Sequence, residues 1–130
     1  MRRNVSVLII DDNPGFVKRM SGMLDEMNNI KSIHSAGNYD EALELLDQNK
    51  HDMVLLDINL PGKSGISLLE QMKETGHASE VIMLSNHSGS YYRQKCKMLG
   101  AAHFLDKTVE FDKVPSVINE ILARNQYSLS

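Results

Sequence analysis

The sequence alternates short apolar runs with segments of helical periodicity, and this alternation constrains the fold more than any other feature. The runs recur at Val5–Ile10, Lys31–His34, Met53–Leu56, Val81–Leu84 and Ala102–Leu105. Three of them are nearly continuous in apolar residues, which is typical of strands covered on both faces. Strand–helix repeated five times predicts an α/β fold: a doubly wound, five-stranded parallel sheet with five helices in a three-layer sandwich.

The predicted helices have recognisable starts and apolar stripes. Asn13 can cap a helix whose first residue is Pro14, and Asn38 with Glu41 resembles a capping box. Ala42, Leu45 and Leu46 follow that box as a buried stripe. Residues at helical spacing predict further helices, marked by Val17, Met20, Leu24 and Met27, by Tyr92, Cys96 and Leu99, and by Val114, Val117, Ile118, Ile121 and Leu122.

Composition limits the classes of protein that need to be considered. A chain of 130 residues suits one domain. Its single cysteine, Cys96, cannot form an internal disulfide, so we expect a reducing, cytoplasmic location. The apolar runs are far shorter than the roughly 20 residues of a membrane-spanning helix. A net charge of −3 offers no general attraction for nucleic acid, so we expect neither membrane nor nucleic-acid binding.

Chemistry-bearing residues follow the predicted strands where each one ends. Asp11 and Asp12 follow the first run, Asp57 follows the third, Ser85 ends the fourth and Lys107 follows the fifth. In an open parallel sheet, ligands bind beyond the carboxyl ends of the strands, so these side chains are expected to share one rim. Asp11 and Asp12 alone would be read as a solvated helix start. Asp57 changes that interpretation, because nothing about an apolar strand requires a carboxylate at its end.

Three clustered carboxylates predict a cation site. Two like charges about 4 Å apart repel by roughly 4 kcal/mol at an effective dielectric near 20. A divalent cation relieves this repulsion, and hard oxygen ligands favour Mg²⁺ over zinc or copper. Carboxylates, Mg²⁺ and a lysine together suit phosphoryl transfer, with Asp57 as the nucleophile and Lys107 stabilising charge on the phosphoryl oxygens.

These residues, taken together, resemble the receiver domain of two-component response regulators over roughly Val5 to Ala123. The resemblance is carried by Asp11-Asp12, Asp57–Gly62 with Gly65, Ser85, Gly100-Ala101 and Phe104–Lys107. It implies a flavodoxin-like fold with strand order 2-1-3-4-5. It also implies a receiver domain over residues 1–124 and a tail over 125–130.

The resemblance assigns roles residue by residue. Asp57 is expected to accept a phosphoryl group from a sensor histidine kinase. Asp12, Asp57 and the backbone carbonyl of Asn59 are expected to hold Mg²⁺, with Asp11 assisting through water. Lys107 would pair with the phosphoryl group.

The resemblance also implies a switch and an output face. Ser85 would bond the phosphoryl group while Phe104 turns inward. The fourth helix, fifth strand and fifth helix would then bind a downstream effector protein or output domain.

Four residues depart from the family pattern. Phe104 stands where tyrosine is common, so without a hydroxyl we expect it to favour the inward position. Thr108 replaces a frequent proline, which predicts a less constrained turn. Asn86 replaces a small residue and is expected to alter access to Asp57, and His87 is either a solvated loop residue or a group that orients water.

Several alternatives remain beside this interpretation. A phosphatase with an aspartyl nucleophile needs a second acid two positions later, where this chain has Asn59. A flavodoxin needs a phosphate loop after the first strand, where Asp11 and Asp12 would repel phosphate. The chain is therefore expected to be a phosphoacceptor rather than an enzyme, with two alternatives: a receiver fragment of a longer transcriptional regulator, or an interaction module independent of phosphorylation.

Overall fold

One parallel sheet organises the molecule, in the order β2-β1-β3-β4-β5. The structure is a computed structural model that describes residues 5–86 and 90–128, with side chains for 5–86 and 91–124. The strands are β1 (Val5–Ile10), β2 (Ile30–Ala36), β3 (Met53–Asp57), β4 (Glu80–Ser85) and β5 (His103–Asp106). The helices are α1 (Pro14–Asp25), α2 (Tyr39–Gln48), α3 (Gly65–Glu74), α4 (Ser90–Met98), the short 3₁₀ helix η1 (Phe111–Lys113) and α5 (Val114–Ser128). The predicted fold class and strand order are confirmed.

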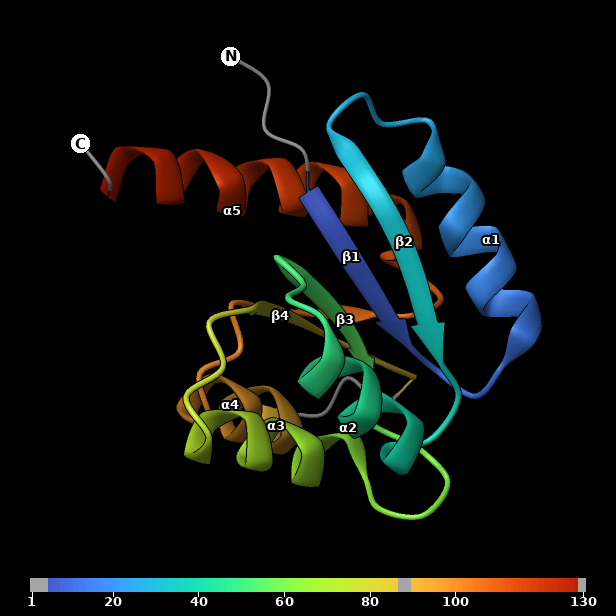
Figure 1. Ribbon diagram of the computed structural model, residues 1–130, viewed down its shortest axis with the longest axis vertical. Helices are drawn as coiled ribbons and strands as arrows, with labels where there is room; N and C mark the ends of the chain where they lie inside the picture. The colour runs from blue at the N-terminus through green and yellow to red at the C-terminus, as the bar shows by residue number, and fades with distance from the viewer. Residues whose placement is uncertain (1–4, 87–89, 129–130) are drawn as a thin grey trace.

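Alternate residues of each strand enter different layers of the sandwich. In β1, Val5, Val7 and Ile9 pack with α1 and α5, whereas Leu8 and Ile10 pack with α2, α3 and α4. Figure 1 shows the sheet between these two groups of helices. Because both of their faces are covered, the central strands β1, β3 and β4 have nearly continuous apolar sequences, whereas the edge strand β2 does not.

The cap of α1 agrees with the prediction. Asn13 Oδ1 accepts a hydrogen bond from the Phe16 amide at 3.1 Å, and Pro14 begins the helix. The buried residues of the helix are Phe16, Met20 and Leu24. Val17 and Met27 are half-buried and pack against the same core cluster. The signal for Phe16 was its spacing of four residues from Met20.

The cap of α2 is a variant of the predicted capping box. Asn38 Oδ1 accepts from the Glu41 amide at 2.8 Å. Glu41 reaches back to the amide of Gly37, at 2.7 Å, rather than to that of Asn38. Both contacts satisfy amides at the start of the helix that would otherwise lack partners.

Helix α4 is anchored by few buried side chains. Cys96 is fully buried and Leu99, just after the helix, is half-buried. Tyr92, one turn before Cys96, is 37% exposed. Burying one large apolar side chain contributes only about 1.5–3 kcal/mol, so α4 is attached more weakly than helices with three or four buried residues.

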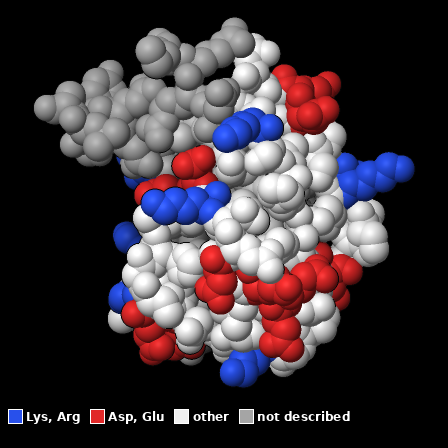
Figure 2. Space-filling model, viewed as in Figure 1, with Lys and Arg blue, Asp and Glu red and all other residues white. Residues whose placement is uncertain are grey.

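Helix α5 continues through Ser128, beyond the domain boundary expected at residue 124. Within the described residues, no helix is both long and apolar enough to cross a membrane. Acidic side chains gather over α2 on the face drawn in Figure 2, where the exposed carboxylates are Asp40, Glu41, Glu44 and Asp47. This acidic face is unsuited to binding a polyanion.

Candidate functional site

Three carboxylates meet at the carboxyl ends of β1 and β3. The two strands are parallel neighbours with Ile10 paired to Leu56, so the residues that follow, Asp11 and Asp57, emerge side by side. One carboxylate oxygen each of Asp11, Asp12 and Asp57 lies within 4.8 Å of the others. Asp11 and Asp57 are only 3% and 4% exposed, whereas Asp12 is exposed. The structure therefore brings together the acidic residues that the sequence predicts.

Lys107 reaches this cluster from the end of β5, the edge strand that lies beyond β3 and β4 in the sheet. Its amide donates to the carbonyl of Ser85 at 2.9 Å, just beyond the paired residues Ser85 and Asp106 of β4 and β5. The Nζ atom lies 2.6 Å from Asp11 Oδ2 and 3.4 Å from Asp57 Oδ2. The ammonium thus bridges two acids, and its closer partner is Asp11.

Each buried carboxylate has one oxygen oriented by the backbone. Asp11 Oδ1 accepts from the Asn13 amide at 2.9 Å, and Asp57 Oδ1 accepts from the Asn59 amide at 3.2 Å. Both are contacts to the residue two positions on, which a short acidic side chain makes readily. The second oxygen of each carboxylate is left facing Lys107.

The protonation equilibria reflect this crowding. Burial, followed by the charge of Asp11, raises the pKa of Asp57, although Lys107 and the Asn59 amide act in the opposite direction. Burial alone would lower the pKa of Lys107, but its contacts with Asp11 and Asp57 raise it. Lys107 is therefore charged, and ionised Asp57 is held at an energetic disadvantage that an added cation would relieve.

The donor set fits a hard divalent cation. Three carboxylates and one ammonium leave a formal charge of −2 at the cluster, and all the acidic ligands are oxygens. Asp11 Oδ2 is buried, and its close partner is the Lys107 ammonium at 2.6 Å. Mg²⁺ prefers such oxygen ligands, with water completing its coordination. Asn59, the further expected ligand, is exposed next to Asp57.

Gly65 allows the chain to pass against the backbone of Asp57. Its amide donates to the Ile58 carbonyl at 2.7 Å. A Cβ at this position would lie 2.0 Å from the Asp57 carbonyl oxygen, far inside van der Waals contact. Only glycine fits here, and this explains the place of Gly65 in the motif that follows Asp57.

Ser85 and Phe104 lie where the sheet connects the acidic rim to α4. Ser85 is fully buried at the end of β4, and Phe104 is 7% exposed in β5. The Arg93 guanidinium of α4 lies 4.8 Å from the Phe104 ring centroid, and Arg93 Nη1 donates to the Phe104 carbonyl at 3.3 Å. The structure therefore holds Phe104 in the inward position under a cation from α4.

Hydrogen bonds to Asp106 hold the turn after Lys107. Asp106 Oδ1 accepts from the amides of both Thr108 and Val109 at 2.8 Å, and these bonds lower the pKa of Asp106. A proline at position 108 would lack the first of these donors. Thr108 Oγ1 also donates to Asn86 Oδ1 at 3.4 Å, whereas His87 lies outside the described residues.

Sequence reasoning missed two side chains that contact the predicted site residues. The Phe16 ring packs beneath Lys107, with its centroid 4.4 Å from Nζ, and Arg93 covers Phe104. The first contact joins elements far apart in the chain, whereas the second joins the consecutive elements α4 and β5. Phe16 could have been suspected from its place in the first turn after Asp11 and Asp12, but no local pattern pairs Arg93 with Phe104.

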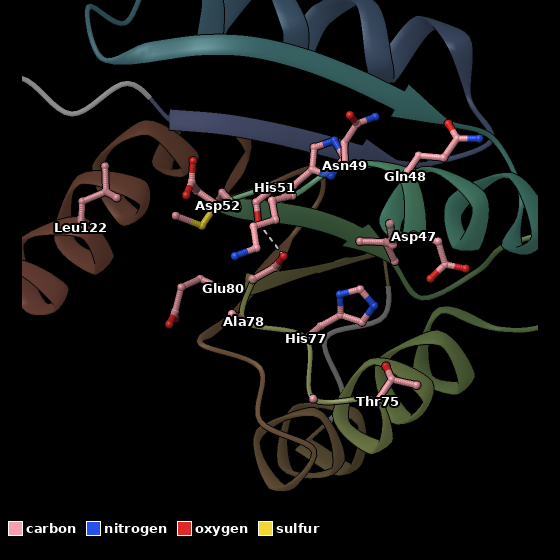
Figure 3. Close-up of a pocket in the computed structure, with 15 residues that line it drawn as sticks. Asp47, Gln48, Asn49, His51, Asp52, Thr75, His77, Ala78, Glu80 and Leu122 are labelled. Carbon is pink, nitrogen blue, oxygen red and sulfur yellow. Dashed lines mark hydrogen bonds between the residues drawn. The ribbon is translucent and has the colours of Figure 1, made fainter.

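A cavity of about 630 Å³ lies at the opposite end of the strands from the acidic rim, between the loops that precede β3 and β4. Figure 3 shows His51 and His77 among the residues that line this cavity. Ser79 Oγ donates to the His51 carbonyl at 2.5 Å, and this bond ties the two loops together. Burial, followed by the nearby His34, lowers the pKa of His51. This cavity contains none of the rim residues.

Comparison with known proteins finds a family profile that matches most of this chain. The profile described as "Response regulator receiver domain" matches residues 7–119. The transcriptional regulatory protein MctR of Rhizobium johnstonii is 31% identical over 126 residues, covering 97% of this chain and 59% of that protein. A protein-glutamate methylesterase/protein-glutamine glutaminase of Desulfotalea psychrophila is 35% identical, covering 95% and 34% respectively. The chain thus spans between about a third and three fifths of the length of these relatives.

Solved structures agree with the fold. The receiver domain of the Francisella response regulator 1452 superposes with a TM-score of 0.86 at 26% identity, covering 94% of this chain and 99% of that one. The response regulator domain of Thermotoga maritima CheB gives a TM-score of 0.81 at 25% identity, covering 93% and 96%.

Proposed function

The chain belongs to the response regulator receiver family, and from this premise we propose that Asp57 accepts a phosphoryl group from a sensor histidine kinase and thereby switches a protein-binding face. The observation that carries the proposal is the placement of Lys107 Nζ against Asp57 Oδ2 at 3.4 Å inside a three-carboxylate cluster. This is a nucleophile beside a fixed positive charge at the ligand-binding edge of a parallel sheet.

The proposed reaction is a displacement at phosphorus. A carboxylate oxygen of Asp57 forms the new oxygen–phosphorus bond, while the nitrogen–phosphorus bond of the phosphohistidine donor breaks and the imidazole leaves with the electron pair. The ammonium of Lys107, already next to Asp57, is then in reach of the oxygens that carry the transferred negative charge.

Asp11, Asp12 and Asp57 would hold Mg²⁺, with the Asn59 carbonyl as a further ligand. When bound, Mg²⁺ would neutralise charge on the phosphoryl oxygens during transfer. Asp11 and Asp57 each have one oxygen fixed by an amide, so these two carboxylates are oriented before any ligand arrives.

The proposed switch acts through Ser85 and Lys107, with the Phe104 ring biased toward its inward position. Moving a two-state equilibrium from 1:99 to 99:1 takes about 5.5 kcal/mol, and charged hydrogen bonds contribute about 1.5–3 kcal/mol each. Bonds from Ser85 and Lys107 to the phosphoryl group together supply most of that difference. The weakly anchored α4, with β5 and α5, would present the altered surface.

The proposed role is that of a phosphoacceptor rather than an enzyme, in the cytoplasm, with a histidine kinase and a downstream effector protein or output domain as partners. The lengths of the curated relatives support a second possibility, that this receiver acts within a longer regulator. Neither membrane nor direct nucleic-acid binding by this chain is part of the proposal.

The test is incubation with acetyl phosphate and Mg²⁺, followed by intact-mass measurement. We expect one phosphoryl adduct in the wild type and in Asp47→Asn, which changes an exposed carboxylate of α2, and none in Asp57→Asn. Lys107→Ala is expected to retain the adduct but to lose the structural change at α4 that accompanies phosphorylation. NMR spectra of α4 residues would detect that change. An adduct that survives Asp57→Asn, or a wild type that acquires none, would contradict the proposal and favour a module independent of phosphorylation.

A further inference from the structure

The neutral aromatic ring of Phe16 contacts the ammonium of Lys107. The Nζ atom lies 4.4 Å from the centroid of Phe16, within the range of an attractive cation–π contact. Phe16 is 7% exposed, so the ring is largely shielded from water. We propose that Phe16 is a positioning residue, which holds the Lys107 ammonium toward Asp57 for the phosphoryl transfer proposed above. This inference rests on that proposed function.

The contact between Phe16 and Lys107 completes a closed chain of interactions that begins and ends at Asp11. The Asn13 amide donates to Asp11 Oδ1, and the Phe16 amide donates to Asn13 Oδ1. The Phe16 ring faces Lys107, whose Nζ returns to Asp11 Oδ2. The same cap that starts α1 therefore sets the ring and one acid on two sides of a single ammonium.

The ring is itself held in place by its neighbours. Phe111 of η1 meets it edge to face, with centroids 5.7 Å apart and planes at 83°. The Arg19 guanidinium lies 4.6 Å from the Phe111 centroid. Phe16 is therefore a packed surface against which a flexible lysine can be oriented, rather than a side chain free to follow it.

A lysine needs such a surface because its ammonium sits on a long, flexible stem. Its two carboxylate contacts change whenever Asp57 is protonated, binds a cation or becomes phosphorylated. The contact with Phe16 does not depend on any of these states, because the ring carries no titratable group. Phe16 is thus the partner that can keep Nζ near Asp57 throughout the reaction.

The test compares Phe16→Leu with Phe16→Tyr, which retains the ring. In wild type and in Phe16→Tyr, the Hε protons of Lys107 should be shifted upfield in the NMR spectrum by the ring current, and in Phe16→Leu this shift should disappear. Phosphorylation by acetyl phosphate should slow between about 2-fold and 30-fold in Phe16→Leu, the span of measured cation–π contacts, and recover in Phe16→Tyr. Leu24→Val, a truncation in the same helix away from Lys107, controls for loss of core packing.

The outcomes separate the two proposals. If Phe16→Leu loses the ring-current shift but keeps the wild-type rate, or if Leu24→Val slows the reaction as much, positioning by Phe16 is wrong. If Lys107 shows no ring-current shift in wild type, the contact itself is wrong. If wild type acquires no phosphoryl group, the proposed function fails, and the NMR comparison still decides whether Phe16 orients Lys107.

Discussion

Arg93 and Phe104 form the contact that joins α4 to β5, with the guanidinium 4.8 Å from the ring centroid. Arg93 also approaches Glu110, at 3.5 Å between Nη2 and Oε1, and Glu110 accepts from the Asp106 amide at 3.0 Å. One arginine thus ties a weakly buried helix to a strand and to the turn that follows Lys107. Any movement of α4 therefore has to break this contact or move Phe104 together with Arg93.

Replacing Arg93 should weaken the attachment of α4 to β5 and allow the Phe104 ring to move faster. We expect Arg93→Ala to lower the free energy of unfolding by about 0.5–1 kcal/mol, typical of a partly exposed cation–π contact. The NMR lines of the Phe104 ring should also report faster motion. Lys63→Ala is a matched control, because Lys63 lies 5.2 Å from the Tyr39 ring centroid, away from α4. Unchanged Phe104 lines in Arg93→Ala would show that Arg93 does not restrain the ring.

Phe104 should stay inward in both states of the switch. It has no hydroxyl to bond water or a partner when turned outward, and it is only 7% exposed beneath Arg93. Crystal structures of the free and phosphomimic-bound protein should therefore show the same buried ring. Finding Phe104 outward in both would refute the expectation.

Gly65 should tolerate no side chain. A Cβ would meet the Asp57 carbonyl at 2.0 Å, so we expect Gly65→Ala to cost at least about 2 kcal/mol of stability, toward the upper end of overpacking effects. A Cβ at Gly22 in α1 would meet nothing within 4 Å, and Gly22→Ala should stabilise by about 0.5–1 kcal/mol. Urea denaturation of the two variants compares them, and equal effects would contradict this account.

Mg²⁺ should stabilise the folded protein through the acidic cluster. At ten times its Kd the ion adds about 1.4 kcal/mol, which for a domain of this size raises Tm by about 3–6 °C. The shift should be much smaller in Asp12→Asn and unchanged in Asp25→Asn, an exposed acid at the end of α1. Thermal unfolding with and without Mg²⁺ measures it, and an undiminished shift in Asp12→Asn would place the ion elsewhere.

Asp57 should make the protein, in the absence of Mg²⁺, less stable as pH rises. Burial, then Asp11, raises its pKa in the folded state, so folding binds a proton between about pH 3.9 and that raised pKa. The stability present below this window is lost as pH rises through it. Asp57→Asn should therefore exceed wild type in free energy of unfolding at pH 7, with the difference shrinking toward pH 4.

Asp106 supplies a control of opposite sign. Amide hydrogen bonds from Val109 and Thr108 lower its pKa, so its contribution is present above the unfolded pKa and lost as pH falls through the folded one. Asp106→Asn should accordingly be less stable than wild type at pH 7. Urea titrations at both pH values check the pair, and a change of the same sign in both variants would contradict the assignment.

Local sequence was sufficient to predict most of the fold. The strands, the Asn13 and Asn38 caps and the sheet order agree with the prediction, the order having come from the family resemblance. The periodic spacing predicted helices but not the full set of residues that each one buries. Phe16 and Val17 are neighbouring apolar residues, and only the packing of α1 on the sheet decides which is the more buried.

The sequence by itself determined which residues share the rim, because Asp11, Asp57 and Lys107 all lie where predicted parallel strands end. The pairing of β1 with β3 in the structure brings Asp11 and Asp57 side by side. Only the tertiary structure decided their partners. It placed Lys107 nearer to Asp11 than to Asp57, and set Phe16 beneath its ammonium. Such contacts depend on side-chain directions across elements joined by long crossovers. Those directions are fixed by sheet register and helix packing, which no local pattern encodes.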